Sequence, residues 1–125
     1  MFKRVDYEHS VAMFNTIRVQ IWVEDDKLHY SKNVLKRPSE KVKDEISSVS
    51  VEEFSKKIEV LRIGTWKKIY QPQEYAVMDG ESWTVKYEDI DGIKAKSSGD
   101  NAYPSNWKAF QALLSSIVGR IDIDQ

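Results

Sequence analysis

Alternating apolar and polar residues predict a β-hairpin in the first third of the chain. Apolar side chains occupy every second position over residues 16–23, which is the period of a strand with one buried face. The alternation resumes over residues 27–32, after the acidic turn at 24–26. Trp22 falls on the polar face of the first strand, so it is either covered by another element or available for contact.

A second pattern predicts a helix that begins after Ser50. Ser50 and Glu53 form a capping box, in which the serine hydroxyl accepts from the backbone N–H of the glutamate. Gly64 is expected to end the helix. The apolar positions recur at spacings of three and four, which define one helix face: Val51, Phe54, Ile58 and Leu61.

The remaining elements are predicted to be strands and a final helix. Residues 83–87 and 93–97 alternate on either side of the turn Asp91–Gly92, and Asp79–Gly80 is a second turn dipeptide. A short strand is expected within 66–70. The last helix starts near Pro104 and ends at Gly119, with an apolar face between them.

The predicted order is ββ-α-β(β)β-α, which is typical of an α+β fold. We expect an antiparallel sheet of four to five strands with two helices packed on it. The whole chain, residues 1–125, is predicted to be one domain. The segment around 33–49 is charged, weakly periodic and contains Pro38, so it is interpreted as a charged mobile loop. Its apolar residues could alternatively form one short extra element: Val34, Leu35, Val42 and Ile46.

Composition narrows the classes of function. The chain has no cysteine, which excludes disulfides, thiolate nucleophiles and thiolate metal sites. The 19 basic and 20 acidic residues are nearly balanced, which argues against binding nucleic acid through its phosphates. No signal-peptide pattern and no apolar run of membrane-spanning length is present, so we expect a cytoplasmic protein that does not enter a membrane.

Motifs for catalysis are missing from the sequence. His9 and His29 have no partner at metal-ligand spacing, and His9 is expected near a frayed start of the chain. No nucleophile elbow and no phosphate-binding glycine loop occurs. We therefore expect no metal and no cofactor, and a non-enzymatic function is favoured.

The segment KSSGDNAYPSNW, residues 96–107, leaves two interpretations open. It is either a strand-to-helix connection, in which polar side chains satisfy loop and helix-end amides, or a surface site. In the second interpretation the site combines acceptors, donors and aromatic faces from Asp100, Asn101, Tyr103 and Trp107.

The C-terminal half also carries a pattern of the form W…Y…DG..W…SG.NAYP, spread over Trp66, Tyr70, Asp79–Gly80, Trp83 and residues 98–104. It resembles small uncharacterised bacterial proteins. The resemblance implies a bacterial origin and an α+β fold, and it implies no catalytic residue. Some bacterial proteins of this size and layout are immunity partners of secreted toxins, and that link is one of analogy.

Two functions follow as hypotheses. The first is a non-catalytic protein-binding module, such as an immunity or accessory protein, or a homodimer formed through an exposed sheet face or edge. Its expected aromatic anchors are Trp22, Tyr30, Trp66 and Trp107. The second is a small enzyme or ligand-binding protein, whose site would be formed by Asp79, Asp100, Asn101 and Tyr103.

Overall fold

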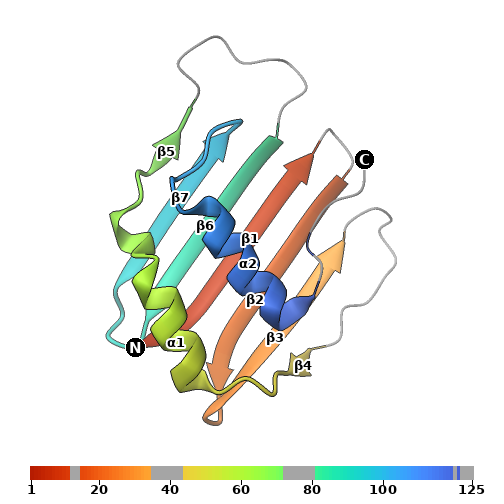
Figure 1. Ribbon diagram of the computed structural model, residues 1–125, viewed down its shortest axis with the longest axis vertical. Coiled ribbons are helices and arrows are strands. Elements are labelled where there is room, and N and C mark those ends of the chain that lie inside the picture. The colour runs from red at the N-terminus through yellow and green to blue at the C-terminus, as the bar shows by residue number, and fades with distance from the viewer. Residues whose placement is uncertain (12–14, 35–43, 72–80, 120, 122–125) are drawn as a thin grey trace.

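The described residues fold into one seven-stranded sheet with two helices on the same face (Figure 1). The computed structural model describes residues 1–11, 15–34, 44–71, 81–119 and 121. The strands are β1 (Phe2–Val11), β2 (Asn15–Glu24), β3 (Lys27–Val34), β4 (Glu45–Ile46), β5 (Ile69–Tyr70), β6 (Glu81–Asp89) and β7 (Lys94–Asp100). The helices are α1 (Val51–Val60) and α2 (Trp107–Val118), with a 3₁₀ turn at Ile63–Thr65.

The strand order across the sheet is β4-β3-β2-β1-β6-β7-β5. All neighbours are antiparallel except β5 and β7. The α+β class, the antiparallel sheet and the two helices are therefore confirmed. The predicted number of four to five strands is too low, because β1 was not recognised and β4 is only two residues long.

The largest correction concerns the start of the chain, where the sequence predicted fraying and the structure has the central strand β1. Val5, Tyr7 and His9 of β1 are buried, and the residues between them face away from the core. A register shift between Phe2 and Arg4 breaks the alternation at the beginning of the strand. The apolar–polar alternation of residues 2–11 was not recognised as a strand, because it starts irregularly and because His9 occupies one of its buried positions.

The predicted hairpin of residues 16–23 and 27–32 is confirmed as β2 and β3, each extended by a few residues. Asp25 and Asp26 form its turn with φ values of 53° and 60°, a conformation that aspartate tolerates better than most residues. Across the sheet, every second residue of the central strands points toward the helices. These residues include Val5, Val19, Ile21, Leu28 and Val85, all fully buried.

Helix α1 begins as predicted, because the Ser50 hydroxyl accepts from the Glu53 backbone N–H at 3.0 Å. It ends earlier than expected, at Val60, and Gly64 lies in the 3₁₀ turn that follows. Arg62 is the residue with a left-handed backbone here, at φ 49°. Phe54 and Ile58 are the deeply buried residues of its apolar stripe.

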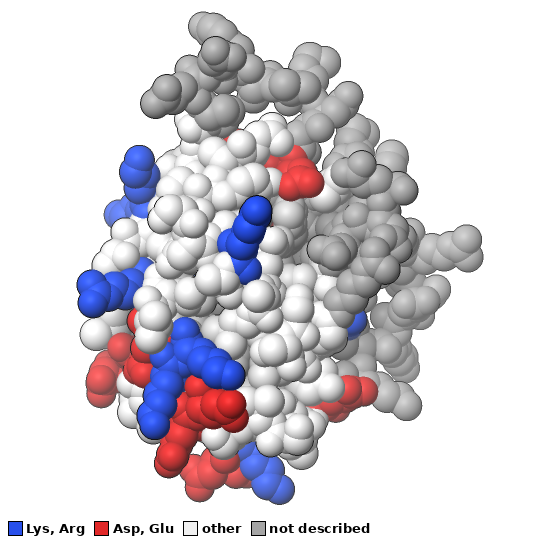
Figure 2. Space-filling view, viewed as in Figure 1, with Lys and Arg blue, Asp and Glu red and all other residues white. Residues whose placement is uncertain are grey.

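Helix α2 starts at Trp107, three residues after Pro104, and Gly119 ends it with φ 83°. Its buried side includes Trp107, Phe110 and Leu114, which close the core over the sheet. Figure 2 shows this helix-covered face: charged side chains gather low on it, where Figure 1 places α1, and much of the surface over α2 is uncharged.

Two sequence predictions fall wholly or partly outside the described residues. The turn at Asp79–Gly80 is one of them. The loop predicted around 33–49 is the other: its first residues belong to β3, Glu45–Ile46 form β4, and residues 35–43 lie outside the description. Of the described residues in this range, Asn33, Val34, Glu45 and Ile46 are therefore in strands.

Candidate functional site

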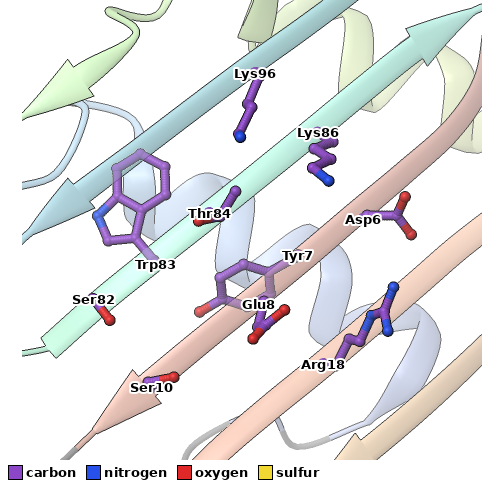
Figure 3. A pocket seen from close by; sticks show the side chains of 10 residues that line it. All are labelled: Asp6, Tyr7, Glu8, Ser10, Arg18, Ser82, Trp83, Thr84, Lys86 and Lys96. Carbon is purple, nitrogen blue, oxygen red and sulfur yellow. The ribbon is translucent and has the colours of Figure 1, made fainter.

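The second face of the sheet is covered by neither of the described helices, and it is hollowed. Its hollow measures about 290 Å³ and spans β1, β2, β6 and β7. Figure 3 shows it from close by, with charged side chains on each of these four strands. We call it the open face, and its central charged residues are Asp6, Glu8, Arg18, Lys86 and Lys96.

Strand register explains why these side chains meet. Asp6 on β1 lies opposite Lys86 on β6, and Glu8 lies opposite Arg18 on β2. Lys86 in turn lies opposite Lys96 on β7. In an antiparallel sheet, directly opposite residues point to the same side and their Cβ atoms are about 5 Å apart. The open face is therefore a continuous charged surface across four strands.

One carboxylate of this surface, that of Asp6, forms an ion pair within the protein. The guanidinium of Arg4 donates to Asp6 from Nε at 3.1 Å and from Nη2 at 3.3 Å. Both residues are on β1 and two positions apart, so they project from the same face. This pair also lines a second hollow of about 320 Å³, which continues toward Lys94 on β7.

Trp22 lies on β2 at one side of the open face, as the sequence predicted. Its ring stacks on His29 of β3, with centroids 5.8 Å apart and an interplanar angle of 19°. The Arg4 guanidinium carbon lies 5.7 Å from the Trp22 ring centroid, within range of a cation–π contact. Trp22 is thus half-buried and held in place by its neighbours, a pre-ordered aromatic surface.

The other three expected anchors lie elsewhere. Trp107 is 7% exposed and belongs to the core, and Trp66 packs against that core. Tyr30 projects from the helix side of β3, where its hydroxyl donates to the Glu45 carboxylate at 2.5 Å. The structure therefore does not bring the four aromatic residues together.

At one end of the core, four polar side chains form a network. His9 contacts the Tyr7 hydroxyl through Nδ1 at 2.5 Å and the Glu81 carboxylate through Nε2 at 3.2 Å. The Tyr103 hydroxyl donates to the same carboxylate. A neutral His9 that carries its proton on Nε2 satisfies both of its contacts.

Burial is the main influence on the titration of this network. It lowers the pKa of His9, and the neighbouring Glu81 carboxylate opposes that shift. It also raises the pKa of Tyr103, and the hydrogen bond to Glu81 adds to the rise. Both shifts favour the neutral forms of His9 and Tyr103 near neutral pH.

The segment around Asn101 serves a structural purpose. The Asn101 side-chain oxygen accepts from the Glu81 backbone N–H at 2.8 Å, and its backbone is left-handed at φ 53°. The indole N–H of Trp83 donates to the Ala102 carbonyl at 2.9 Å. Asp100 ends β7 on the open face, away from Tyr103. The structure therefore separates Asp100 from Asn101 and Tyr103, and Asp79 lies outside the described residues.

Sequence reasoning missed most of the open face. Lys86, Lys96 and Arg18 are polar positions of predicted strands, so the alternation placed them on one face, but it could not order the strands. Asp6 and Glu8 were missed because β1 was not recognised. The signal that could have found them is the run of charged residues at every second position from Arg4 to Glu8.

Within the described residues, no three histidine, aspartate or glutamate side chains converge as they would around a metal ion. Among the same residues, no helix is both long enough and apolar enough to cross a membrane. Nor does any family model, curated protein or solved structure match this chain. The open face and the His9 network are accordingly interpreted from their own geometry.

Proposed function

We propose that the chain is a non-catalytic protein-binding module and that its partner docks on the open face of the sheet. The observation that carries the proposal is this face itself, uncovered by the described helices and hollowed across four strands. Trp22 and Arg4 at its side are of the residue types that dominate binding hot spots.

The distribution of polar contacts supports binding over catalysis. The side chains of Asn101 and Tyr103 already bond to Glu81, and His9 is hydrogen-bonded on both ring nitrogens. The alternative, a small enzyme or ligand-binding protein at Asp79, Asp100, Asn101 and Tyr103, would need these groups turned toward a common cavity. Asp100 instead belongs to the opposite face.

A partner protein is favoured over edge-to-edge pairing of two copies. Both outer strands of the sheet, β4 and β5, are two residues long. Such short strands offer few free backbone groups for strand addition, and they cover part of the edges of β3 and β7, at His29–Tyr30 and Ser98–Gly99. More specifically, we propose an immunity or accessory protein. This part of the proposal rests on the resemblance to small bacterial proteins and on the analogy with immunity proteins of similar size.

The test is a pull-down with the full chain at physiological salt, followed by reconstitution with the purified partner and calorimetry. Trp22→Ala is expected to weaken the complex about 30-fold, the equivalent of the ~2 kcal/mol that marks a hot spot. Val60→Ala is the matched control, because Val60 is 77% exposed on α1, on the helix-covered face. No stoichiometric partner, or a partner that responds to Val60→Ala and not to Trp22→Ala, would overturn the proposal.

A further inference from the structure

On the open face, two lysine side chains on neighbouring strands lie directly opposite each other. Lys86 on β6 is directly opposite Lys96 on β7, and both side chains are exposed. Like charges at directly opposite positions destabilise an antiparallel pair. Within the part of the chain that the structure describes, neither ammonium group has an ion pair or hydrogen bond.

Two of the nearby carboxylates, Asp6 and Glu88, are engaged by other cations. Asp6 lies opposite Lys86 but accepts two hydrogen bonds from Arg4. Glu88, two residues after Lys86, pairs with Lys3 at 3.4 Å. Lys94, which lies directly opposite Glu88, adds a third ammonium group two residues before Lys96. The β6–β7 side of the open face therefore carries an excess of positive charge.

Both hollows of the open face meet at this pair, since Lys86 and Lys96 line each of them. Figure 3 shows the two side chains rising from neighbouring strands beside Thr84. A carboxylate placed between the two ammonium groups would bond to both and cancel their repulsion.

We propose that Lys86 and Lys96 receive a carboxylate from an acidic segment of the partner protein. This inference rests on the proposed function and names the chemistry of the partner. Repulsion between the lysines in the free protein is relieved in the complex, so the unfavourable pair contributes to affinity and specificity at the expense of stability.

The surroundings favour an acidic protein segment over a nucleic acid. Asp6, Glu8 and Asp100 flank the pair on the same face. A phosphate backbone that continued across the face would meet these carboxylates, whereas a short acidic segment ends before them. The formal net charge of −1 likewise gives no long-range attraction for a polyanion.

A first experiment uses a defined probe. A three-residue polyglutamate peptide, blocked at both ends so that it stays short enough to end before the flanking carboxylates, is titrated into the isotopically labelled chain, and backbone and lysine side-chain NMR shifts are followed. Shifts centred on Lys86 and Lys96 are expected, and they should disappear in Lys86→Ala/Lys96→Ala. Shifts spread evenly over all lysines, or none, would overturn the inference. So would tighter binding of an oligothymidine of equal charge at the same residues.

A second experiment separates binding from folding. Lys96→Glu replaces the repulsive pair by an attractive one, so its urea midpoint is expected to rise. Its affinity for the purified partner is expected to fall about tenfold or more, as for loss of a buried charge contact. Lys96→Arg should retain binding, and Lys108→Glu on the exposed side of α2 is the matched charge reversal that leaves it unchanged.

The outcomes distinguish the two proposals. A partner lost on Trp22→Ala and unaffected by Lys96→Glu would overturn the acidic-segment inference and leave the proposed function standing. A partner that binds through the helix-covered face, or one released by nuclease, would overturn both. Carbodiimide coupling in the complex gives the direct support: amide bonds from Lys86 or Lys96 to partner carboxyl groups, and none from Lys108.

Discussion

At the scale of a single residue, Gly99 on β7 lies in close contact with Trp83 on β6 and with Ala102 in the segment before α2. A Cβ atom at this position would lie 2.5 Å from the Trp83 indole nitrogen and 2.6 Å from the Ala102 carbonyl oxygen. These two atoms are the donor and acceptor of the hydrogen bond that fixes Trp83 against the segment before α2. Glycine is therefore required by space, since its φ is not in the left-handed region.

Gly99→Ala is expected to lower the free energy of unfolding by about 1–3 kcal/mol, the usual range for overpacking a tight site. Urea denaturation measures the change. Gly64→Ala is the control, because a Cβ atom there has no neighbour within 4 Å. Equal stability of the two variants would show that the chain at Gly99 relaxes without cost.

His9 couples the fold to pH. Its lowered pKa means that the unfolded chain binds a proton more readily than the folded one. Stability is therefore complete above the ordinary histidine value of about 6.5 and decreases as the pH falls from there to the lowered pKa of the folded state. The groups that face His9 are Tyr7 from β1, Glu81 from β6 and Tyr103 from the segment before α2.

His9→Gln is expected to reduce the loss of stability between pH 6.5 and pH 5. Urea midpoints at closely spaced pH values measure the slope. If His9→Gln and the unmodified chain show the same slope, the acid sensitivity arises from other groups.

At the scale of an element, helix α1 depends on its first turn. The Ser50 cap satisfies one backbone N–H that the helix itself leaves without a partner. Ser50→Ala is expected to cost ~1 kcal/mol of stability, measured by thermal or urea unfolding. Ser105→Ala, at an exposed position before α2, is the control. A loss of the same size in both variants would contradict a specific capping effect.

The secondary-structure elements that the sequence predicts correctly are those with a regular local sequence pattern. The hairpin of β2 and β3, the cap of α1 and the turn at Asp91–Gly92 have strong local signals, and the sequence predicts all three. Strand β1 was missed because its alternation begins only after the register shift between Phe2 and Arg4, and because His9, a polar residue, takes one of its buried positions. Its burial depends on β6, which is distant in sequence, and no local pattern reports such a pairing.

The candidate site was less predictable than the fold for the same reason. Alternation placed Trp22, Lys86 and Lys96 on polar faces, and the structure keeps them there. Only strand order reveals that Lys86 and Lys96 oppose each other beside Asp6. Conversely, the sequence suggested Trp107 and Asn101 as binding residues. In the structure Trp107 is buried in the core, and the Asn101 side chain accepts a hydrogen bond from the Glu81 backbone.

At the scale of the whole molecule, one core joins both halves of the chain. Buried residues from β1, β2, β3, β6 and both helices belong to the same cluster. We expect unfolding in urea to be a single transition, with tryptophan fluorescence and far-ultraviolet circular dichroism giving the same midpoint. Separate midpoints would show that the β1–β2–β3 hairpins and the C-terminal half unfold independently.

The central position of β1 has a consequence for synthesis on the ribosome. The three-stranded meander β1–β2–β3 can form once residue 34 has left the exit tunnel, because its pairings are local. Its apolar face then waits for α2, whose residues emerge last among the described elements. Until α2 emerges, the apolar side of this meander therefore lacks the helix that covers it in the folded protein, and exposed apolar surface of this kind favours aggregation of a nascent chain.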